Sequence, residues 1–271
     1  MLDYLMQFEP HAHMLAFALG STRLMVFAMV APFMGSAVVT GTAKSALVLS
    51  LYLVIHPAVL EALPVHGELT GAVYLTILFL ALKEAFIGFI LGWLAGLVFW
   101  AVEAAGMFID NQRGAASANE MNMMTAEQST PTGGFLFQSC TYVFYASGTF
   151  IAYLALVYGT YELWPVGEWL PAAFFTKQGA ALFFGELVAV LAVNMVLISA
   201  PVVLACLFTD VALGLVNRFA SQLNVYVLAM PIKSALSSFL LIFYFAVLMT
   251  DAPERFSAFG IDVSQLRIWM K

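Results

Sequence analysis

Long apolar runs follow one another along the whole chain, and this spacing most restricts how the protein can fold. A helix needs about 20 apolar residues to cross a bilayer, and several runs reach or exceed that length. Only 10% of the 271 residues are charged, whereas a soluble domain carries roughly 25% charge. We therefore expect an all-α membrane protein. Because no linker-like region separates the runs, residues 1–271 are expected to form a single helical domain.

We count about six hydrophobic segments, the third of them longer than one span needs, and a polar C-terminal tail at 251–271. The segments are 14–39, 45–66, 69–105, 135–161, 179–208 and 225–250. Several contain proline, at Pro32, Pro57, Pro201 and Pro231. These prolines indicate either broken, hairpin-like helices whose freed carbonyls bind neighbouring protein, or simply the greater tolerance of membrane helices for proline. The two interpretations have equal weight.

The one long polar passage runs from Gly106 to Gly134. Apolar runs lie on both sides, so this passage must meet water, a pore or protein. Met121, Met123 and Met124 lie in it, and methionine is an unbranched side chain that fills irregular gaps. From the residues alone, a deformable stopper and an ordinary loop folded back onto the helices are equally good interpretations.

A stripe of small and charged residues follows one face of the third segment. Glu84, Gly88, Gly92 and Gly96 recur every four residues, and on a continued helix Glu103, Asp110 and Arg113 return to the same arc. Small residues let another helix approach closely, and carboxylates avoid lipid. We expect this stripe to be the main packing face of the segment.

Charged residues at membrane depth cost roughly 2.5–3.5 kcal/mol each against lipid, so they should face protein or water. They are Arg23, Lys83, Glu84, Glu103, Glu186, Asp210, Arg218 and Lys233. They fit ion pairs that fix an assembly, or a proton or ion relay. Alternatively, some lie at the membrane interfaces with their charged ends in water.

Motifs for catalysis, metal binding and nucleotide binding are absent from the sequence. The four histidines, His11, His13, His56 and His66, form no metal-binding arrangement, and there is no phosphate-binding loop or nucleophile elbow. Ten scattered Lys and Arg with a net charge of −6 form no basic stripe for nucleic acid. We expect no enzyme, cofactor, metal or nucleic-acid partner.

Taken together, the residues resemble the FliR/SctT family, the T component of bacterial type III secretion export gates. The resemblance covers nearly the whole chain. It is carried by Thr22-Arg23-Leu24, Ala31-Pro32, Lys44, Pro57, Glu84 with Gly88 and Gly92, Ala105-Gly106, Ile109 to Gly114, Ala212 to Asn224 and Pro231-Ile232-Lys233. Asp110 to Gly114, Ser129 to Thr132 and Leu163 to Val166 are more similar to the injectisome branch than to the flagellar one, which usually has Ala-Pro where this chain has Ala220-Ser221.

The resemblance implies inclined, Pro-broken helical hairpins that pack into a helical complex in the inner membrane, within the basal body of a secretion system. Its partners would be the P/R-type and Q/S-type components, the switch and large gate components, and secreted unfolded proteins in transit. The matching plug or gate residues are Asp110, Gln112, Arg113, Gly114, Met121, Met123 and Met124. The residues expected in helix packing and assembly are Arg23, Glu84, Gly88, Gly92, Gly96, Glu103, Arg218 and Lys233.

A small proton- or ion-coupled transporter is the alternative function. It would use the carboxylates of Glu84, Glu103, Asp110 and Glu186 as a relay across the membrane. This alternative expects a protein that is folded and active alone, whereas the export-gate interpretation expects one that is unstable without its partner subunits.

Overall fold

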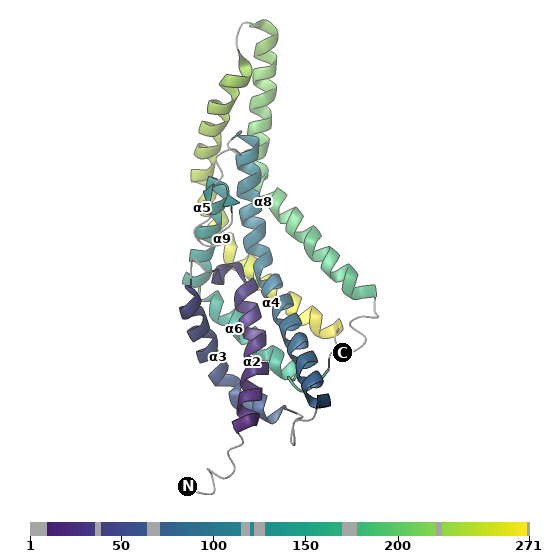
Figure 1. Ribbon diagram of the computed structural model, residues 1–271. Coiled ribbons are helices and arrows are strands. Elements are labelled where there is room, and N and C mark those ends of the chain that lie inside the picture. Colours follow the sequence, from purple (N-terminus) through teal and green to yellow (C-terminus); the bar gives the residue numbers. More distant parts are fainter. Residues whose placement is uncertain are drawn as a thin grey trace. The chain divides into compact units, whose positions relative to one another are not determined.

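Helices make up nearly all of the chain that the structure describes (Figure 1). The structure is a computed structural model and describes residues 10–35, 39–63, 71–114, 120–121, 128–169, 178–220 and 224–269. The elements are α2 (Pro10–Val30), η1 (Pro32–Met34), α3 (Gly41–Glu61), α4 (Gly71–Gln112), β1 (Glu120–Met121), β2 (Gln128–Ser129), α5 (Pro131–Ala146), α6 (Thr149–Leu163), α8 (Gln178–Phe219) and α9 (Val225–Trp269).

The prediction of an all-α membrane protein with about six segments is confirmed. Within the described ranges, α2, α3, α4, α8 and α9 each contain a stretch long and apolar enough to cross a membrane. The pair α5–α6 passes the same test together, but its two helices meet at an angle of 75°. The bend falls at Gly148, which has a left-handed φ of 73°, a conformation that glycine adopts without steric cost.

The prolines behave in two ways. The chain leaves α2 before Pro32, which begins the short helix η1. The helices α3, α8 and α9 instead continue through Pro57, Pro201 and Pro231. At these three positions tolerance of proline is therefore the correct interpretation, and a broken helix is not. The expected polar tail likewise belongs to α9, which continues to Trp269.

Backbone contacts divide the chain into two compact units, and α4 contributes to both. Unit 1 contains Met1–Gly96, Ile151–Ala180 and Phe259–Lys271, and unit 2 contains Leu97–Phe150 and Ala181–Ala258.

In unit 1, α2 packs along α3 (Figure 1). A side chain at Gly20 would lie 2.7 Å from the Tyr52 ring, so the bare glycine permits this close approach. Edge-to-face contacts of Phe33 with Phe27 and Tyr153 connect α2, η1 and α6. Aromatic pairs of this geometry contribute about 0.5–1.5 kcal/mol beyond the area that they bury.

In unit 2, a buried aromatic cluster joins three helices. Phe99 of α4 contacts Phe137 and Phe144 of α5 and stacks on Phe256 of α9, with ring centroids 5.2–6.1 Å apart. These four rings are almost completely buried. They fix the middle of α4 against the start of the bent pair and the later part of α9.

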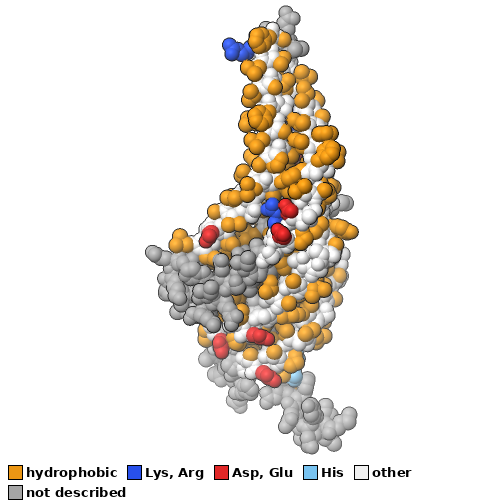
Figure 2. Space-filling model, turned by 180° about the vertical axis from the view of Figure 1, so that it is seen from behind, with side chains coloured by type: hydrophobic (Ala, Val, Ile, Leu, Met, Phe, Trp, Pro, Cys, Tyr) orange, Lys and Arg blue, Asp and Glu red, His pale blue; other side chains and the backbone are white. Residues whose placement is uncertain are grey.

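Most of α8 and α9 belongs to unit 2, and the later half of α8 runs beside the first half of α9 (Figure 1). A small core of Ile109, Val202 and Cys206 packs against Leu240 and Leu241 of α9. Many other apolar side chains of this hairpin are exposed, and Figure 2 shows hydrophobic side chains over its visible face. The exposed residues include Leu197, Leu204, Phe208, Leu215, Phe219, Val227, Phe239, Ile242 and Phe243.

Candidate functional site

Two buried polar networks are the candidate functional sites, one in each unit. The first centres on Arg23, in the middle of α2, whose side chain is fully buried. Its Nε and Nη2 donate to the two carboxylate oxygens of Glu84 at 2.7 and 3.0 Å. Its remaining contacts come from α6 and the turn after it: Nη1 donates to Thr160 Oγ1 at 3.0 Å and Nη2 to the Trp164 carbonyl at 2.8 Å.

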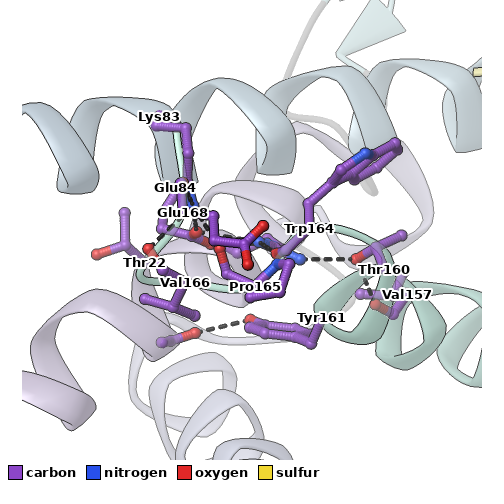
Figure 3. A network of polar contacts seen from close by, with 12 residues as sticks. Thr22, Lys83, Glu84, Val157, Thr160, Tyr161, Trp164, Pro165, Val166 and Glu168 are labelled. Atoms are coloured by element: carbon purple, nitrogen blue, oxygen red, sulfur yellow. Dashed lines mark hydrogen bonds and ion pairs between the residues drawn. The ribbon is translucent and has the colours of Figure 1, made fainter. Parts of the chain in front are cut away.

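Lys83 brings a second cation to the same carboxylate. Its Nζ lies 2.7 Å from Glu84 Oε1 and donates to the carbonyls of Pro165, Val166 and Glu168 at 2.9–3.0 Å. Figure 3 shows Pro165, Val166 and Glu168 of the turn after α6 next to Lys83 and Glu84. Two cations thus share one carboxylate, and backbone carbonyls together with the Thr160 hydroxyl provide the remaining acceptors.

The charged network is enclosed by an aromatic ring and by close backbone contact. The guanidinium carbon of Arg23 lies 4.0 Å from the centroid of the Tyr161 ring, a cation–π geometry. Tyr161 in turn donates its hydroxyl to the Gly20 carbonyl at 2.7 Å. A side chain at Gly88 would collide with the backbone carbonyl of Arg23, and one at Gly92 would lie 2.8 Å from Val30 Cβ.

Four of the residues predicted for helix packing and assembly take part in these contacts. Arg23, Glu84, Gly88 and Gly92 lie together where α2 meets α4, and the glycines permit the helix approach that the ion pair requires. Buried ion pairs hold geometry when every donor is matched. A carboxylate bound by two cations is poorly suited to exchange protons along a relay.

The second network closes the base of the loop between α4 and α5. Asp110 is fully buried, and its Oδ2 accepts from the Thr132 backbone N–H at 2.8 Å while its Oδ1 accepts from the Thr132 hydroxyl at 2.6 Å. Arg113 Nε donates to Asp110 Oδ1 at 2.7 Å, and its Nη2 donates to Thr132 Oγ1 at 3.0 Å. Three side chains therefore join the two ends of the loop.

The backbone around this network explains where the loop begins and ends. A side chain at Gly106 would lie 2.6 Å from Gly133 Cα, so α4 and α5 touch through their backbones. Gly114, with φ of 82°, follows the end of α4 in the left-handed conformation common after helices. Thr130 caps α5 by accepting from Gly133 N–H at 3.3 Å.

The predicted loop boundaries were too wide. Residues from Gly106 to Gln112 belong to α4, and Pro131 begins α5, because the Asp110 carboxylate finds protein donors and allows the helix to continue. Within the loop, Glu120 pairs with Ser129 and Met121 with Gln128 across β1 and β2. Met123 and Met124 lie outside the described residues, as does the side chain of Met121.

The hydrogen bonds and close contacts of the two networks described above do not include the other residues predicted for packing, assembly, the plug or the relay. Gly96 is buried, Gln112 and Glu103 are half-buried, and Arg218 is exposed near the end of α8. Lys233 forms a separate ion pair with Asp210, 3.0 Å away, between α9 and α8. Glu186, a member of the alternative relay, is exposed.

Thr132, Thr160 and the carbonyls of the turn after α6 complete the two networks but were assigned no role from the sequence. Two of the motifs that carry the family resemblance contain these groups and could have indicated them. Thr132 belongs to the motif Ser129–Thr132, and the turn after α6 begins within the motif Leu163–Val166. Within the described ranges, no group of three His, Cys, Asp or Glu side chains is placed to hold a metal ion.

Comparison with known proteins gives matches over most of the chain. Residues 14–259 match the family described as bacterial export proteins, family 1. The Yop proteins translocation protein T of Yersinia pestis is 34% identical over 242 residues, covering 89% of this chain and 90% of that protein. The surface presentation of antigens protein SpaR of Salmonella typhimurium is 28% identical over 255 residues, covering 94% and 92%. The flagellar biosynthetic protein FliR of Bacillus subtilis is 33% identical over 185 residues, covering 66% and 68%.

Proposed function

This chain belongs to the bacterial export proteins, family 1, and we propose that it is a subunit of the export apparatus of a type III secretion system in the bacterial inner membrane. The observation that carries this proposal is the family match over residues 14–259, which includes both buried networks. The matches to the Yop proteins translocation protein T and to the surface presentation of antigens protein SpaR each cover about nine tenths of the chain. This coverage favours the injectisome branch over the flagellar one.

The exposed apolar surface supports a place inside a multi-subunit complex. The apolar stretch Leu182–Phe219 has 38 residues, and only 22% of its most apolar window is buried. At 1.5 Å per residue such a helix rises about 57 Å along its path, whereas the hydrocarbon core is about 30 Å thick. Lipid therefore covers only part of this stretch, and apolar helices of partner subunits would cover the rest. The P/R-type and Q/S-type components are the partners we propose.

We further propose that the loop between α4 and α5 closes the conduit for unfolded protein substrates. The Asp110 network supports this role because it joins the two ends of the loop, where α4 and α5 touch through their backbones. The methionines in the sequence of this loop suit a seal against varied chains, since methionine adapts to irregular surfaces. The protein itself would carry out no catalysis.

Two experiments test these proposals separately. Deletion of the gene should abolish secretion of the system's substrates into the medium, and a plasmid copy should restore it. Secretion that continues without the protein would contradict the role in the export apparatus.

For the loop, residues 121–124 are deleted and the conductance of the inner membrane to small ions is measured in cells that contain the assembled complex. We expect leakage with the deletion. A second variant, Met121→Ser with Met123→Ser and Met124→Ser, keeps the loop length and tests the methionine side chains. Unchanged conductance in a deletion complex that still assembles would exclude the plug role.

A further inference from the structure

Two histidines connect α2 and α3 through a direct hydrogen bond between their rings. His13 Nδ1 lies 2.9 Å from His56 Nε2, and the rings stack at 25° with centroids 5.2 Å apart. The other ring nitrogen of His56, Nδ1, lies 2.6 Å from the hydroxyl oxygen of Tyr52. Tyr52 is only 1% exposed, so the histidine pair has one end anchored in the packed interface of α2 and α3.

The chemistry of imidazole limits how many protons this pair can hold. A neutral ring has one N–H donor and one acceptor nitrogen, and a charged ring has two donors. With both rings neutral, or with one charged, a donor can face an acceptor in the N···N contact. With both rings charged, N–H faces N–H at 2.9 Å, and two positive charges lie in stacked rings. The second proton therefore breaks the contact.

We propose that the His13–His56 pair is an acid-sensitive joint between α2 and α3, closed while the pair holds at most one added proton and open when both rings are charged. Histidine is the side chain whose ordinary pKa, about 6.5, lies nearest to physiological pH. The joint would therefore respond to mild acidification on the side of the membrane where α2 begins and α3 ends. Nothing in the proposed export function requires it.

Among the described residues, titratable side chains of α3, α6 and α2 lie on the helices that carry the pair or contact those helices. Tyr52 on α3 contacts His56 directly, and His13 is the group whose charge faces His56. From α6, the hydroxyls of Tyr158 and Tyr161 donate to backbone carbonyls of α3 and α2. On α2 the exposed His11 precedes His13 by two residues, and on α3 the exposed Glu61 ends the helix. The experiment therefore needs His11 as its control.

The test is a double-mutant cycle on the full chain, purified in its membrane complex. Thermal unfolding midpoints are measured at pH 7.5 and pH 5.5 for the wild type, His13→Gln, His56→Gln and the double variant. At pH 7.5 we expect either single change to lower the midpoint almost as much as both together, because each breaks the same contact. At pH 5.5 the wild type should lose this advantage, a fall of about 2–4 °C in its midpoint relative to the double variant. His11→Gln should respond to acid as the wild type does.

Two results would overturn the proposal. One is an equal loss on acidification in the wild type and the double variant, and the other is a coupling that is unchanged at pH 5.5. If the variants fail to assemble, ¹⁵N-histidine resonances of the wild-type protein provide the measurement. We expect the two rings to titrate in two separated steps, the second accompanied by loss of the N–H···N signal. Independent titration of both rings would refute the joint.

Discussion

Replacing Glu84 by Gln tests the charge balance of the first network. Glu84 accepts three contacts of 2.7–3.0 Å from Arg23 and Lys83 and has no exposed side-chain surface. Glutamine keeps the shape but leaves two buried cations side by side. Removing one partner of a buried ion pair costs about 3–5 kcal/mol. Because most donors of Arg23 and Lys83 keep carbonyl or hydroxyl acceptors, we expect the lower end, about 3 kcal/mol, or roughly 100-fold in the folding equilibrium.

The assay is the thermal unfolding midpoint and the yield of the tagged protein after extraction from membranes. Glu162→Gln, at an exposed position on α6 in the same unit, provides the matched control and should change neither. The double variant Arg23→Met with Glu84→Met should be less damaging than Glu84→Gln alone, because it leaves one buried cation, Lys83 with its three carbonyls, instead of two. If Glu84→Gln behaved like Glu162→Gln, the buried charge balance described for this site would be wrong.

Two further changes test helix packing and the base of the loop. Gly88→Ala should lower stability by about 1–3 kcal/mol, because its new methyl group meets backbone atoms of Arg23 that no rotamer change can move. The control Gly159→Ala, whose methyl group meets nothing within 4 Å, should be neutral or stabilising by about 0.5–1 kcal/mol. Equal unfolding midpoints for the two variants would contradict the close approach of α2 and α4. Thr132→Val removes the hydroxyl that donates to Asp110. If the lost hydrogen bond destabilises the base of the loop by about 1.4 kcal/mol, proteolytic cleavage of the loop should become about tenfold faster. The control Thr132→Ser keeps the hydroxyl and should be cleaved at the wild-type rate.

The helices were predictable because length and polarity alone decide them. A run of 20 apolar residues has few alternatives to a helix in a membrane, and the six predicted segments correspond to α2, α3, α4, the bent pair, α8 and α9. Their ends were less predictable, because an end depends on where polar groups find partners. Asp110 was expected in a loop because it is charged, but it lies in α4 because Thr132, 22 residues later, satisfies it.

The site residues show the same division. A charge inside an apolar run announces that it needs a partner, so Arg23 and Glu84 could be singled out from the sequence. The identity of the partner could not, since 61 residues separate the two and nothing local connects them. The same criterion also selected Arg218, which is exposed near a helix end. Polarity in an apolar run thus identifies candidates, and only the packing of the helices decides which of them meet.

The turn after α6 explains why a motif can matter through its backbone. Pro165 has no N–H, and a residue before proline is restricted to extended conformations, so α6 ends at Leu163. The carbonyls that follow lie outside α6 and are not used in its helical hydrogen bonds, so they can accept from other groups. Arg23 binds the carbonyl of Trp164, and Lys83 binds those of Pro165, Val166 and Glu168. Pro165 therefore ends α6 at the position where the two buried cations bind. These hydrogen bonds go to backbone carbonyls of the turn and not to the proline side chain.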